Sequence, residues 1–239
     1  MSTLSILIPA YNEEKTISII LGKIKNTILS ECVSKEIIVV DDHSTDSTPE
    51  KVKNFISSHP EMCIKYIRLD KNAGKGYALR TAINHSTGDI IIIQDADLEY
   101  NPDDYNLLLP YILSGEYQVV YGSRFLYKKN RHSYQRFYWG GQLVSWIANI
   151  LYSQHLTDEP TCYKMFDATL LKSIPLQCVG FEFCPEITAK VSKLGCKIKE
   201  IPIHYYPRSI EEGKKIQWYD GVEAIWTLLR YRFWRPIPA

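Results

Sequence analysis

Several familiar signatures are missing from this sequence of 239 residues. Its six cysteines include no C-x-x-C pair, which argues against a zinc site or a redox motif and fits free thiols in a reducing compartment. Neither G-x-G-x-x-G nor G-x-x-x-x-G-K-[ST] occurs, so a dinucleotide oxidoreductase and a P-loop NTPase have little support. The formal net charge of +1 gives no nucleic-acid signature. No basic n-region precedes the first apolar segment, so we expect a cytoplasmic rather than an exported protein.

Apolar runs alternate with helical patterns through the first half of the chain. Runs at 4–9, 36–41, 63–69 and 89–93 are predicted as strands, with helical patterns between them. Because these runs are continuously apolar, they indicate a parallel sheet covered by helices on both faces. With 45% hydrophobic residues, the chain has enough apolar side chains for one ordinary globular domain over 1–239.

The predicted strands end in polar or turn-forming segments at 9–13, 41–42, 71–75 and 95–97. In a sheet of this kind, ligands bind beyond the carboxyl ends of the strands, so these segments are expected to share one rim.

The most informative of these segments carries Asp95 and Asp97 directly after the apolar run at 90–93. Side chains alternate along a strand, so both carboxylates are expected on one side, where they can share a divalent cation with a diphosphate. A helix cap or a solvated turn is the alternative interpretation. Asp46, which lies in a Ser/Thr-rich loop before a helical pattern, is predicted as an N-cap with a structural role.

A set of short motifs spans nearly the whole chain. They are IPAYNEE at 8–14, VDDHSTD at 40–46, NAGKG at 72–76, DADL at 95–98, GSR at 122–124, TCYK at 161–164, FEF at 181–183, YYPR at 205–208 and EGKK at 212–215. In this combination the chain resembles family 2 glycosyltransferases of GT-A fold, and among them the dolichol-phosphate mannosyltransferase-like enzymes that load sugars onto polyprenyl phosphates. The resemblance implies an α/β, Rossmann-like sandwich with a mostly parallel central sheet. It also implies a nucleotide-sugar-binding half at 1–123 and an acceptor-binding half at 124–239 that ends in an interfacial helix.

The resemblance implies a set of donor-binding residues. They are Pro9, Tyr11, Glu13, Val40, Asp42, Lys75, Asp95, Ala96, Asp97, Arg208 and Lys214. An aromatic ring and a carboxylate at a strand end, such as Tyr11 and Glu13, can sandwich a nucleotide base and accept its N–H groups. In the alternative, Tyr11 is a packing residue and Glu13 only favours a helix N-terminus.

The metal that the resemblance implies is Mg²⁺ or Mn²⁺, bound by Asp95 and Asp97 with Glu99 as a further ligand. Many similar polyprenyl-phosphate mannosyltransferases have glutamine where this chain has Glu99. The extra carboxylate is therefore expected either to alter the metal preference or to face solvent.

Basic residues in the second half provide candidates for an acceptor phosphate. Arg124 follows an apolar strand at 119–121, where its guanidinium can fork onto phosphate. For a second arginine we favour Arg136 over Arg131, and a solvated surface position is the alternative for both. Together with Asp97, Arg124 and Arg136 form the predicted catalytic set.

Arg208 and Lys214 resemble the basic loop that closes over the donor diphosphate in this family. Such a loop can act as a lid that neutralises the leaving group and excludes water. Without the resemblance, 211–215 reads as an ordinary charged turn.

The stretch 137–157 contains no formally charged residue, but Gly, Gln, Ser and Asn interrupt its apolar character. This pattern favours an amphipathic helix at a membrane interface over a transmembrane helix, with a core helix as the alternative. The segment 226–235 mixes aromatic rings with arginines, as interface anchors do. We therefore expect peripheral attachment to the cytoplasmic face of a membrane, directly or through a membrane-embedded partner subunit.

The predicted activity is inverting transfer of a hexose from a nucleoside diphosphate sugar, of the GDP-mannose or UDP-glucose type, to a polyprenyl or dolichyl phosphate. A phosphate nucleophile, with a second pKa of about 6, needs no protein base near neutral pH. Transfer to a sugar hydroxyl is the alternative and needs a base, for which Asp158 and Glu159 are the nearest candidates. A sugar-nucleotide pyrophosphorylase and a non-catalytic binding subunit rank lower.

Overall fold

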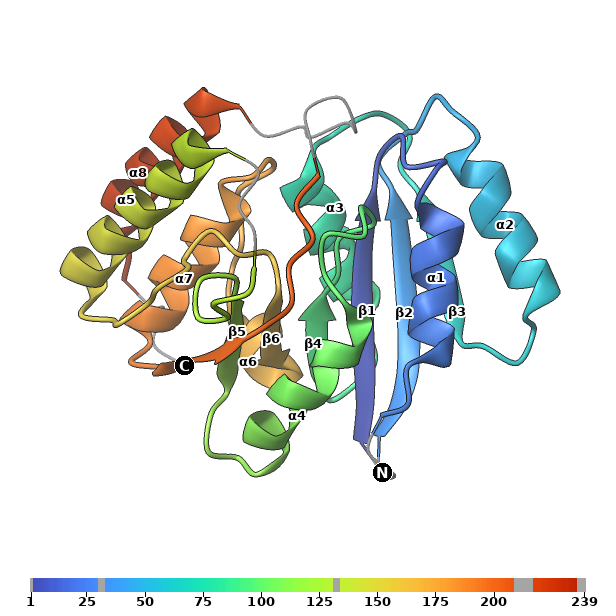
Figure 1. Cartoon of the computed structure of the whole chain (residues 1–239), viewed down its shortest axis with the longest axis horizontal. Helices are drawn as coiled ribbons and strands as arrows, with labels where there is room; N and C mark the ends of the chain where they lie inside the picture. Colours follow the sequence, from blue (N-terminus) through green and yellow to red (C-terminus); the bar gives the residue numbers. More distant parts are fainter. Residues whose placement is uncertain (1, 30–32, 131–133, 209–216, 236–239) are drawn as a thin grey trace.

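The computed structural model describes residues 2–29, 33–130, 134–208 and 217–235. Its strands are β1 (Ser2–Ala10), β2 (Val33–Asp41), β3 (Ile64–Arg68), β4 (Ile90–Ile93), β5 (Val119–Ser123), β6 (Lys164–Asp167) and β7 (Ile198–Pro202). Its helices are α1 (Ile17–Asn26), α2 (Thr48–Ser58), α3 (Lys75–His85), α4 (Tyr105–Leu113), α5 (Gln135–Tyr152), α6 (Ala168–Ser173), α7 (Phe183–Lys193) and α8 (Trp218–Tyr231), with a 3₁₀ turn at Pro102–Asp104. Figure 1 shows how these elements are arranged.

The strands form one seven-stranded sheet in the order β3-β2-β1-β4-β6-β5-β7. The first four strands along the chain pair in parallel, and β7 is parallel to β5. Strand β6 lies antiparallel between β4 and β5. The mostly parallel sheet expected from the sequence is confirmed. The four strands predicted in the first half are all present within two residues of their expected bounds, except that β2 begins three residues earlier.

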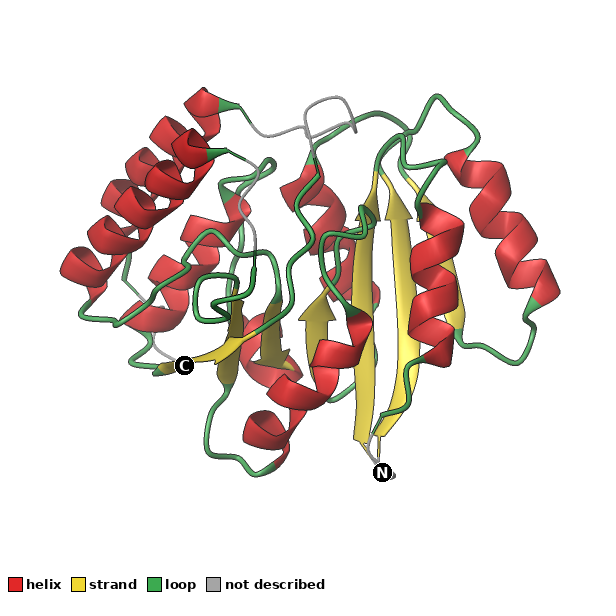
Figure 2. Ribbon diagram, in the orientation of Figure 1, coloured by secondary structure: helices red, strands yellow, loops and turns green. Residues whose placement is uncertain are grey.

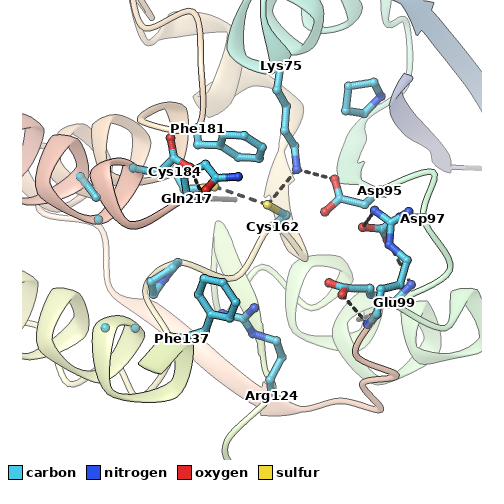
Figure 3. Close-up of a pocket in the computed structure, with 18 of the residues that line it drawn as sticks. Lys75, Asp95, Asp97, Glu99, Arg124, Phe137, Cys162, Phe181, Cys184 and Gln217 are labelled. Atoms are coloured by element: carbon cyan, nitrogen blue, oxygen red, sulfur yellow. Dashed lines mark hydrogen bonds and ion pairs between the residues drawn. The ribbon is translucent and has the colours of Figure 1, made fainter. Parts of the chain in front are cut away.

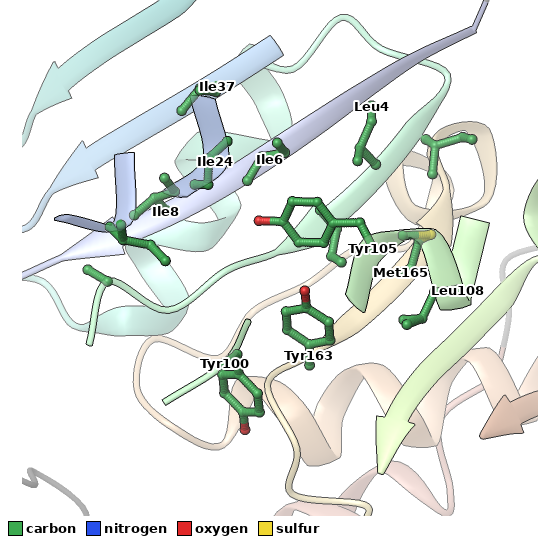
Figure 4. Packing of buried hydrophobic residues seen from close by; sticks show 14 of the residues in the cluster. Leu4, Ile6, Ile8, Ile24, Ile37, Tyr100, Tyr105, Leu108, Tyr163 and Met165 are labelled. Carbon is green, nitrogen blue, oxygen red and sulfur yellow. The ribbon is translucent and has the colours of Figure 1, made fainter. Parts of the chain in front are cut away.

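Alternate residues of the strands enter two different cores on the two faces of the sheet. Figure 2 shows the helices that cover these faces. In β1, Leu4, Ile6 and Ile8 pack with residues of α1, α2 and α4, whereas Leu7 packs on the other face with residues of α3, α6 and α7. Figure 4 shows the first of these clusters. Because both faces of each central strand are buried, neither face requires polar residues, which explains the continuous apolar runs in the sequence.

Helix α1 begins at Ile17 and buries Ile17, Ile20, Leu21 and Ile24 along one side. The preceding loop is fixed by Asp46, whose carboxylate accepts the backbone N–H groups of Thr48 at 2.9 Å and Glu14 at 3.1 Å. The structural role predicted for Asp46 is confirmed, but the prediction that it is the N-cap is wrong, because Ser47 occupies that position before α2.

Helices α5, α7 and α8 build a third cluster of buried residues beside the main sheet, with α5 and α8 side by side at one end of the molecule (Figure 1). Val144 and Ala148 of α5 and Leu228 of α8 lie in it. In the part of the chain that the structure describes, none of the helices combines the length and apolar character needed to cross a membrane.

The start of α3 lies directly against the backbone of 178–180. A Cβ atom added to Gly76 would lie 2.8 Å from the carbonyl oxygen of Cys178 and 2.9 Å from that of Gly180. One residue further on, the backbone N–H of Tyr77 donates to the carbonyl of Val179 at 3.1 Å. Only a glycine at position 76 permits this approach, which sets the place of α3 at the rim of the sheet.

We expect Gly76→Ala to lower the free energy of unfolding by about 1–3 kcal/mol, because the clash is with backbone that cannot rotate away. Gly22→Ala in α1 is the matched control. Nothing lies within 4 Å of its added Cβ, so this variant should raise the free energy of unfolding by about 0.5–1 kcal/mol. Urea unfolding of both variants measures the difference. Equal effects would show that the contact at Gly76 does not constrain α3.

Candidate active site

A pocket of about 690 Å³ opens at the rim formed by the carboxyl ends of β1, β2, β4 and β5 (Figure 3). Of the predicted residues, it is lined by Pro9, Tyr11, Glu13, Asp42, Lys75, Asp95, Ala96, Asp97, Glu99, Arg124, Arg136 and Arg208. Val40 is wholly buried in β2, outside this lining. Lys214 and Arg131 fall outside the described residues. The structure therefore brings most of the predicted donor and acceptor residues into one cavity.

Asp42 shapes the loop at the start of α3. Its two carboxylate oxygens accept the backbone N–H groups of Ala73 at 2.7 Å and Gly74 at 2.9 Å. Gly74 has a φ of 93°, a conformation that favours glycine. Burial raises the pKa of Asp42, although both hydrogen bonds act in the opposite direction. The contact of Asp42 with the base or ribose of a nucleotide stays a prediction. The same side chain also holds this loop in place.

The acidic pair lies in the turn after β4 rather than on the strand itself, and both carboxylates meet basic side chains. Asp95 Oδ1 lies 2.6 Å from Lys75 Nζ. Asp97 Oδ2 lies 2.9 Å from Arg208 Nη2, and the other terminal nitrogen of Arg208 lies 3.2 Å from Glu13 Oε2. Two cations from distant parts of the chain thus neutralise the pair.

The acidic turn is crowded with negative charge. Burial, followed by the charges of Asp95 and Glu99, raises the pKa of Asp97 to about 7 even though Arg208 lowers it. A carboxylate that resists ionisation in this way would gain from a further cation, so the electrostatics favour binding of a divalent ion.

Glu99 organises the segment that carries Arg208. Its carboxylate accepts the backbone N–H of Arg208 at 2.8 Å and the hydroxyl of Tyr205 at 3.1 Å, and its own carbonyl accepts the N–H of Tyr206 at 2.9 Å. Tyr100 also forms an antiparallel bridge with Tyr205. These contacts dock 205–208 on the acidic turn. Metal binding by Glu99 stays a prediction.

The chemistry of this donor set fits Mg²⁺ or Mn²⁺, because carboxylate oxygens are the ligands that these hard ions prefer. Within the described ranges, no three His, Cys, Asp or Glu side chains are placed to hold an ion together. Such a site would therefore draw on few protein ligands and leave positions for phosphate oxygens and water, as is common for Mg²⁺.

On the other side of the pocket, Asp158 holds Arg124 in a fork. The Nε and one terminal nitrogen of Arg124 donate to its two carboxylate oxygens at 2.8 and 2.7 Å. The guanidinium also lies 5.3 Å from the ring centre of Tyr205. Because Asp158 is wholly buried and bound to Arg124, it is a positioning group here rather than an accessible base. Arg136 at the start of α5 lies 5.0 Å from the ring centre of Phe137.

The sequence argument did not single out several residues of the lining. Figure 3 shows Phe137, Phe181, Cys162 and Cys184 in the lining, with the Cys162 sulfur beside the Lys75 ammonium. The cysteines looked scattered because their proximity is tertiary. Their place inside or next to the TCYK and FEF motifs was the available signal.

Comparison with known proteins identifies relatives over most of the chain. The profile of the family described as Glycosyl transferase family 2 matches residues 5–175. Dolichol-phosphate mannosyltransferase of Pyrococcus furiosus is 26% identical over 213 residues, which are 88% of this chain and 58% of that protein. Dolichyl-phosphate beta-glucosyltransferase of Trichomonas vaginalis is 29% identical over 214 residues, 84% of this chain and 65% of the other. Undecaprenyl-phosphate mannosyltransferase of Micrococcus luteus is 24% identical over 233 residues, which are 94% of this chain and 92% of that protein.

The chain thus spans less than two thirds of the length of the first two of these relatives. Among solved structures, glucosyl-3-phosphoglycerate synthase from Mycobacterium tuberculosis, in complex with Mn²⁺, uridine diphosphate and phosphoglyceric acid, matches with a TM-score of 0.72. The match is 21% identical and covers 100% of this chain and 80% of that one, which establishes the fold. The GT-A fold and the family resemblance predicted from the sequence are confirmed. The roles of the individual site residues and the division at 123 stay predictions.

The raised pKa of Asp97 makes a prediction about stability. In the unfolded chain an aspartate titrates near pH 4. The stability that goes with protonated Asp97 is therefore fully present below about pH 4 and is lost progressively as the pH rises from there to about 7. Asp97→Asn removes the ionised form. We expect it to be more stable than the parent at pH 8, by an amount that shrinks toward pH 5, as measured by urea unfolding.

Asp46→Asn is the control, because the opposite pH dependence of stability is expected for it. Hydrogen bonds with Thr48 and Glu14 outweigh burial and lower the pKa of Asp46, so its contribution to stability is present at high pH and lost in acid. This variant should be less stable than the parent at pH 8. A stability change for Asp97→Asn that does not vary with pH would contradict the crowded-charge interpretation.

Proposed function

This chain belongs to glycosyl transferase family 2, and we propose that it is an inverting, metal-dependent enzyme that moves a hexose from a nucleoside diphosphate sugar to a polyprenyl phosphate. One observation carries the proposal: a single pocket is lined by the acidic pair Asp95 and Asp97 and by the arginines Arg124 and Arg136. The first pair suits a donor diphosphate with its metal, and the second suits an acceptor phosphate. The names of the three curated relatives support a lipid-phosphate acceptor.

The donor is proposed to lie along the strand ends, with its base near Pro9, Tyr11 and Glu13 and its ribose near Asp42 and Ala96. Val40 supports this wall from within the core. GDP-mannose and UDP-glucose are the donors to test first. The mycobacterial synthase, whose structure contains uridine diphosphate, supports a nucleoside diphosphate in this fold.

Asp95 and Asp97, with Glu99 as a further ligand, are proposed to hold Mg²⁺ or Mn²⁺, which supplies positive charge to the leaving diphosphate. Lys75 and Arg208 now pair with these same carboxylates. With donor bound, we expect both cations to turn toward phosphate oxygens, so that charge in the pocket stays balanced.

The acceptor phosphate is proposed to bind at Arg124 and Arg136. Asp158 fixes the Arg124 guanidinium from behind, which orients its phosphate-binding side before the acceptor arrives. The phosphate oxygen attacks the anomeric carbon opposite the departing diphosphate and so inverts its configuration. Near neutral pH the nucleophile is already largely dianionic, since its second pKa is about 6.

Water must be kept from the activated sugar, because it competes with the lipid phosphate. Glu99 already docks Arg208 beside the acidic turn. Lys214, which lies outside the described residues, is proposed to act with Arg208 in closing over the diphosphate.

The direct test measures nucleoside diphosphate release from a panel of GDP- and UDP-sugars with Mn²⁺ or Mg²⁺, with and without a short polyprenyl phosphate. We expect release to require the lipid phosphate and to fall at least about a hundredfold in Asp97→Asn. Arg124→Gln and Arg136→Gln should raise KM for the lipid phosphate more than for the donor. Lys53→Gln is the control, because it changes a charge at an exposed position of α2 outside the pocket.

If a donor binds with metal but its turnover ignores lipid phosphate and responds to a sugar hydroxyl, the acceptor class is wrong. Equal effects of Arg124→Gln on donor and acceptor would also remove Arg124 from the acceptor site. Chelation by EDTA with undiminished turnover would exclude metal dependence.

We also propose that the enzyme docks on a membrane through α5 and α8. Along α5 the exposed large residues recur at helical spacing: Trp139, Leu143, Trp146 and Ile150. Along α8 and just after it they are Trp218, Tyr219, Val222, Trp226, Leu229 and Phe233. The inner sides of the same helices pack on α7, so the aromatic face is the outer one.

Two features suit this face to a lipid surface. Arg230, Arg232 and Arg235 are exposed at the end of α8, where they can attract anionic head groups. Gly140 and Gly141 of α5 and Gly221 of α8 line the pocket, so the same two helices border both the proposed bilayer and the acceptor site. A lipid could keep its chain in the membrane while its phosphate enters the pocket.

Replacing Trp139 and Trp146 together by Gln should lower partitioning to vesicles that contain anionic lipid by at least about tenfold, because two interfacial indoles are lost. Leu107→Gln, at an exposed apolar position on α4, is the matched control. Vesicle co-sedimentation makes the measurement. If the parent protein does not sediment, attachment through a membrane-embedded partner subunit becomes the better explanation.

A further inference from the structure

Two cysteines meet in the wall of the pocket. Cys162 precedes β6 and Cys184 lies in the first turn of α7, yet their sulfur atoms are only 3.8 Å apart. Both residues line the cavity, and Cys162 is partly exposed there (Figure 3). The pair is therefore within reach of a small molecule that enters the pocket.

The surroundings of the pair are cationic. Lys75 Nζ donates to the Cys162 sulfur at 3.0 Å while it also contacts Asp95. The hydrogen bond between the two thiols lowers the pKa of Cys184 and raises that of Cys162. The ammonium groups of Lys164 and Lys75 also lower the pKa of Cys184, against the effect of burial. Positive charge beside a thiol favours the thiolate, which is the reactive form.

A bound metal is a poorer explanation of the pair. Two sulfurs at this separation can share an ion, but a third protein ligand is needed for a stable thiolate site. Across the described segments of the chain, no group of three His, Cys, Asp or Glu side chains is placed to hold one. The polar neighbour of Cys162 is instead the Lys75 ammonium, which repels metal cations.

We propose that Cys162 and Cys184 are a redox site: a small-molecule disulfide oxidises them to a reversible intramolecular disulfide, which weakens nucleotide binding in the pocket. The second part rests on the proposed function. One thiolate of the pair attacks the small disulfide, forming a mixed disulfide and releasing one thiolate leaving group. The second cysteine then attacks the protein sulfur, forming the new S–S bond and releasing the second leaving group. The two cysteine protons go to the two released thiolates, so two electrons pass to the oxidant.

Disulfide formation must disturb the donor side of the pocket. A disulfide has its sulfurs about 2.05 Å apart, so the two atoms must approach by roughly 1.8 Å. Cys184 lies just after 178–182, and Val179 in that segment accepts the backbone N–H of Tyr77 at the start of α3. Movement of Cys184 is therefore passed to the start of α3, which carries Lys75. A disulfide sulfur is also a weaker hydrogen-bond acceptor than the sulfur of the reduced cysteine, so the hydrogen bond from Lys75 to Cys162 is weakened.

The experiment uses the full chain in two forms: the parent, and a two-thiol variant in which Cys32, Cys63, Cys178 and Cys196 are replaced by Ser. Each is treated with oxidised glutathione and then with dithiothreitol. Trypsin places Cys162 in 137–164 and Cys184 in 173–190, a peptide that also holds Cys178 in the parent. The two-thiol variant makes the cross-linked pair of peptides unambiguous in mass spectrometry. Cys162→Ser is the negative control, and Cys178→Ser in the parent should still cross-link.

We expect the cross-link in both forms, its loss in dithiothreitol, and a Kd for UDP or GDP with Mn²⁺ that is about tenfold higher in the oxidised protein. No cross-link in the folded parent, under conditions that oxidise a small dithiol, overturns the proposal. A cross-link with unchanged nucleotide affinity overturns its second part. If the reduced protein binds neither nucleotide, the proposed function is what fails, and the peptide masses alone decide whether the disulfide forms.

Discussion

The pairing of partly buried opposite charges at the acidic turn is the interaction on which the site depends. The side chains of Asp95 and Asp97 are only 14% and 15% exposed, and carboxylates with so little access to water need cations close by. Lys75 comes from the start of α3 and Arg208 from the segment after β7, so satisfying the two charges joins three distant parts of the chain. Removing either cation would leave a desolvated carboxylate, which costs far more than an exposed ion pair contributes.

The sequence predicted the strands of the first half of the chain well, because their signals are local. Continuous apolar runs marked the strands, and the polar residues that follow them had to meet at one edge once the strands were parallel. The position of the acidic pair could be inferred from Ile90–Ile93 alone, although its placement in a turn could not. The structural role of Asp46 followed from loop composition in the same way.

The second half was predicted less completely, because its contacts join residues far apart in sequence. The fork between Arg124 and Asp158 spans 34 residues, and no spacing rule identifies it. Glu99 is satisfied by Tyr205 and the backbone of Arg208, more than a hundred residues away. Strand β6 has the sequence KMFD, with only two apolar residues, so it gives no apolar run like that of β4 and its antiparallel insertion could not be predicted.

The direction of β6 has a consequence for how such a protein can diversify. Because β6 runs antiparallel to β5, the end of β5 and the start of β6 are adjacent, as the hydrogen bond from Gly122 N–H to the Tyr163 carbonyl at 2.8 Å shows. The segment 124–163 connects these two strand ends, so it leaves the sheet and rejoins it at the same rim. It carries Arg124, Arg136 and the whole of α5. Such an excursion can be lengthened, shortened or exchanged without breaking a strand, so this wall of the pocket can change while the wall that carries Asp42, Asp95 and Asp97 stays the same.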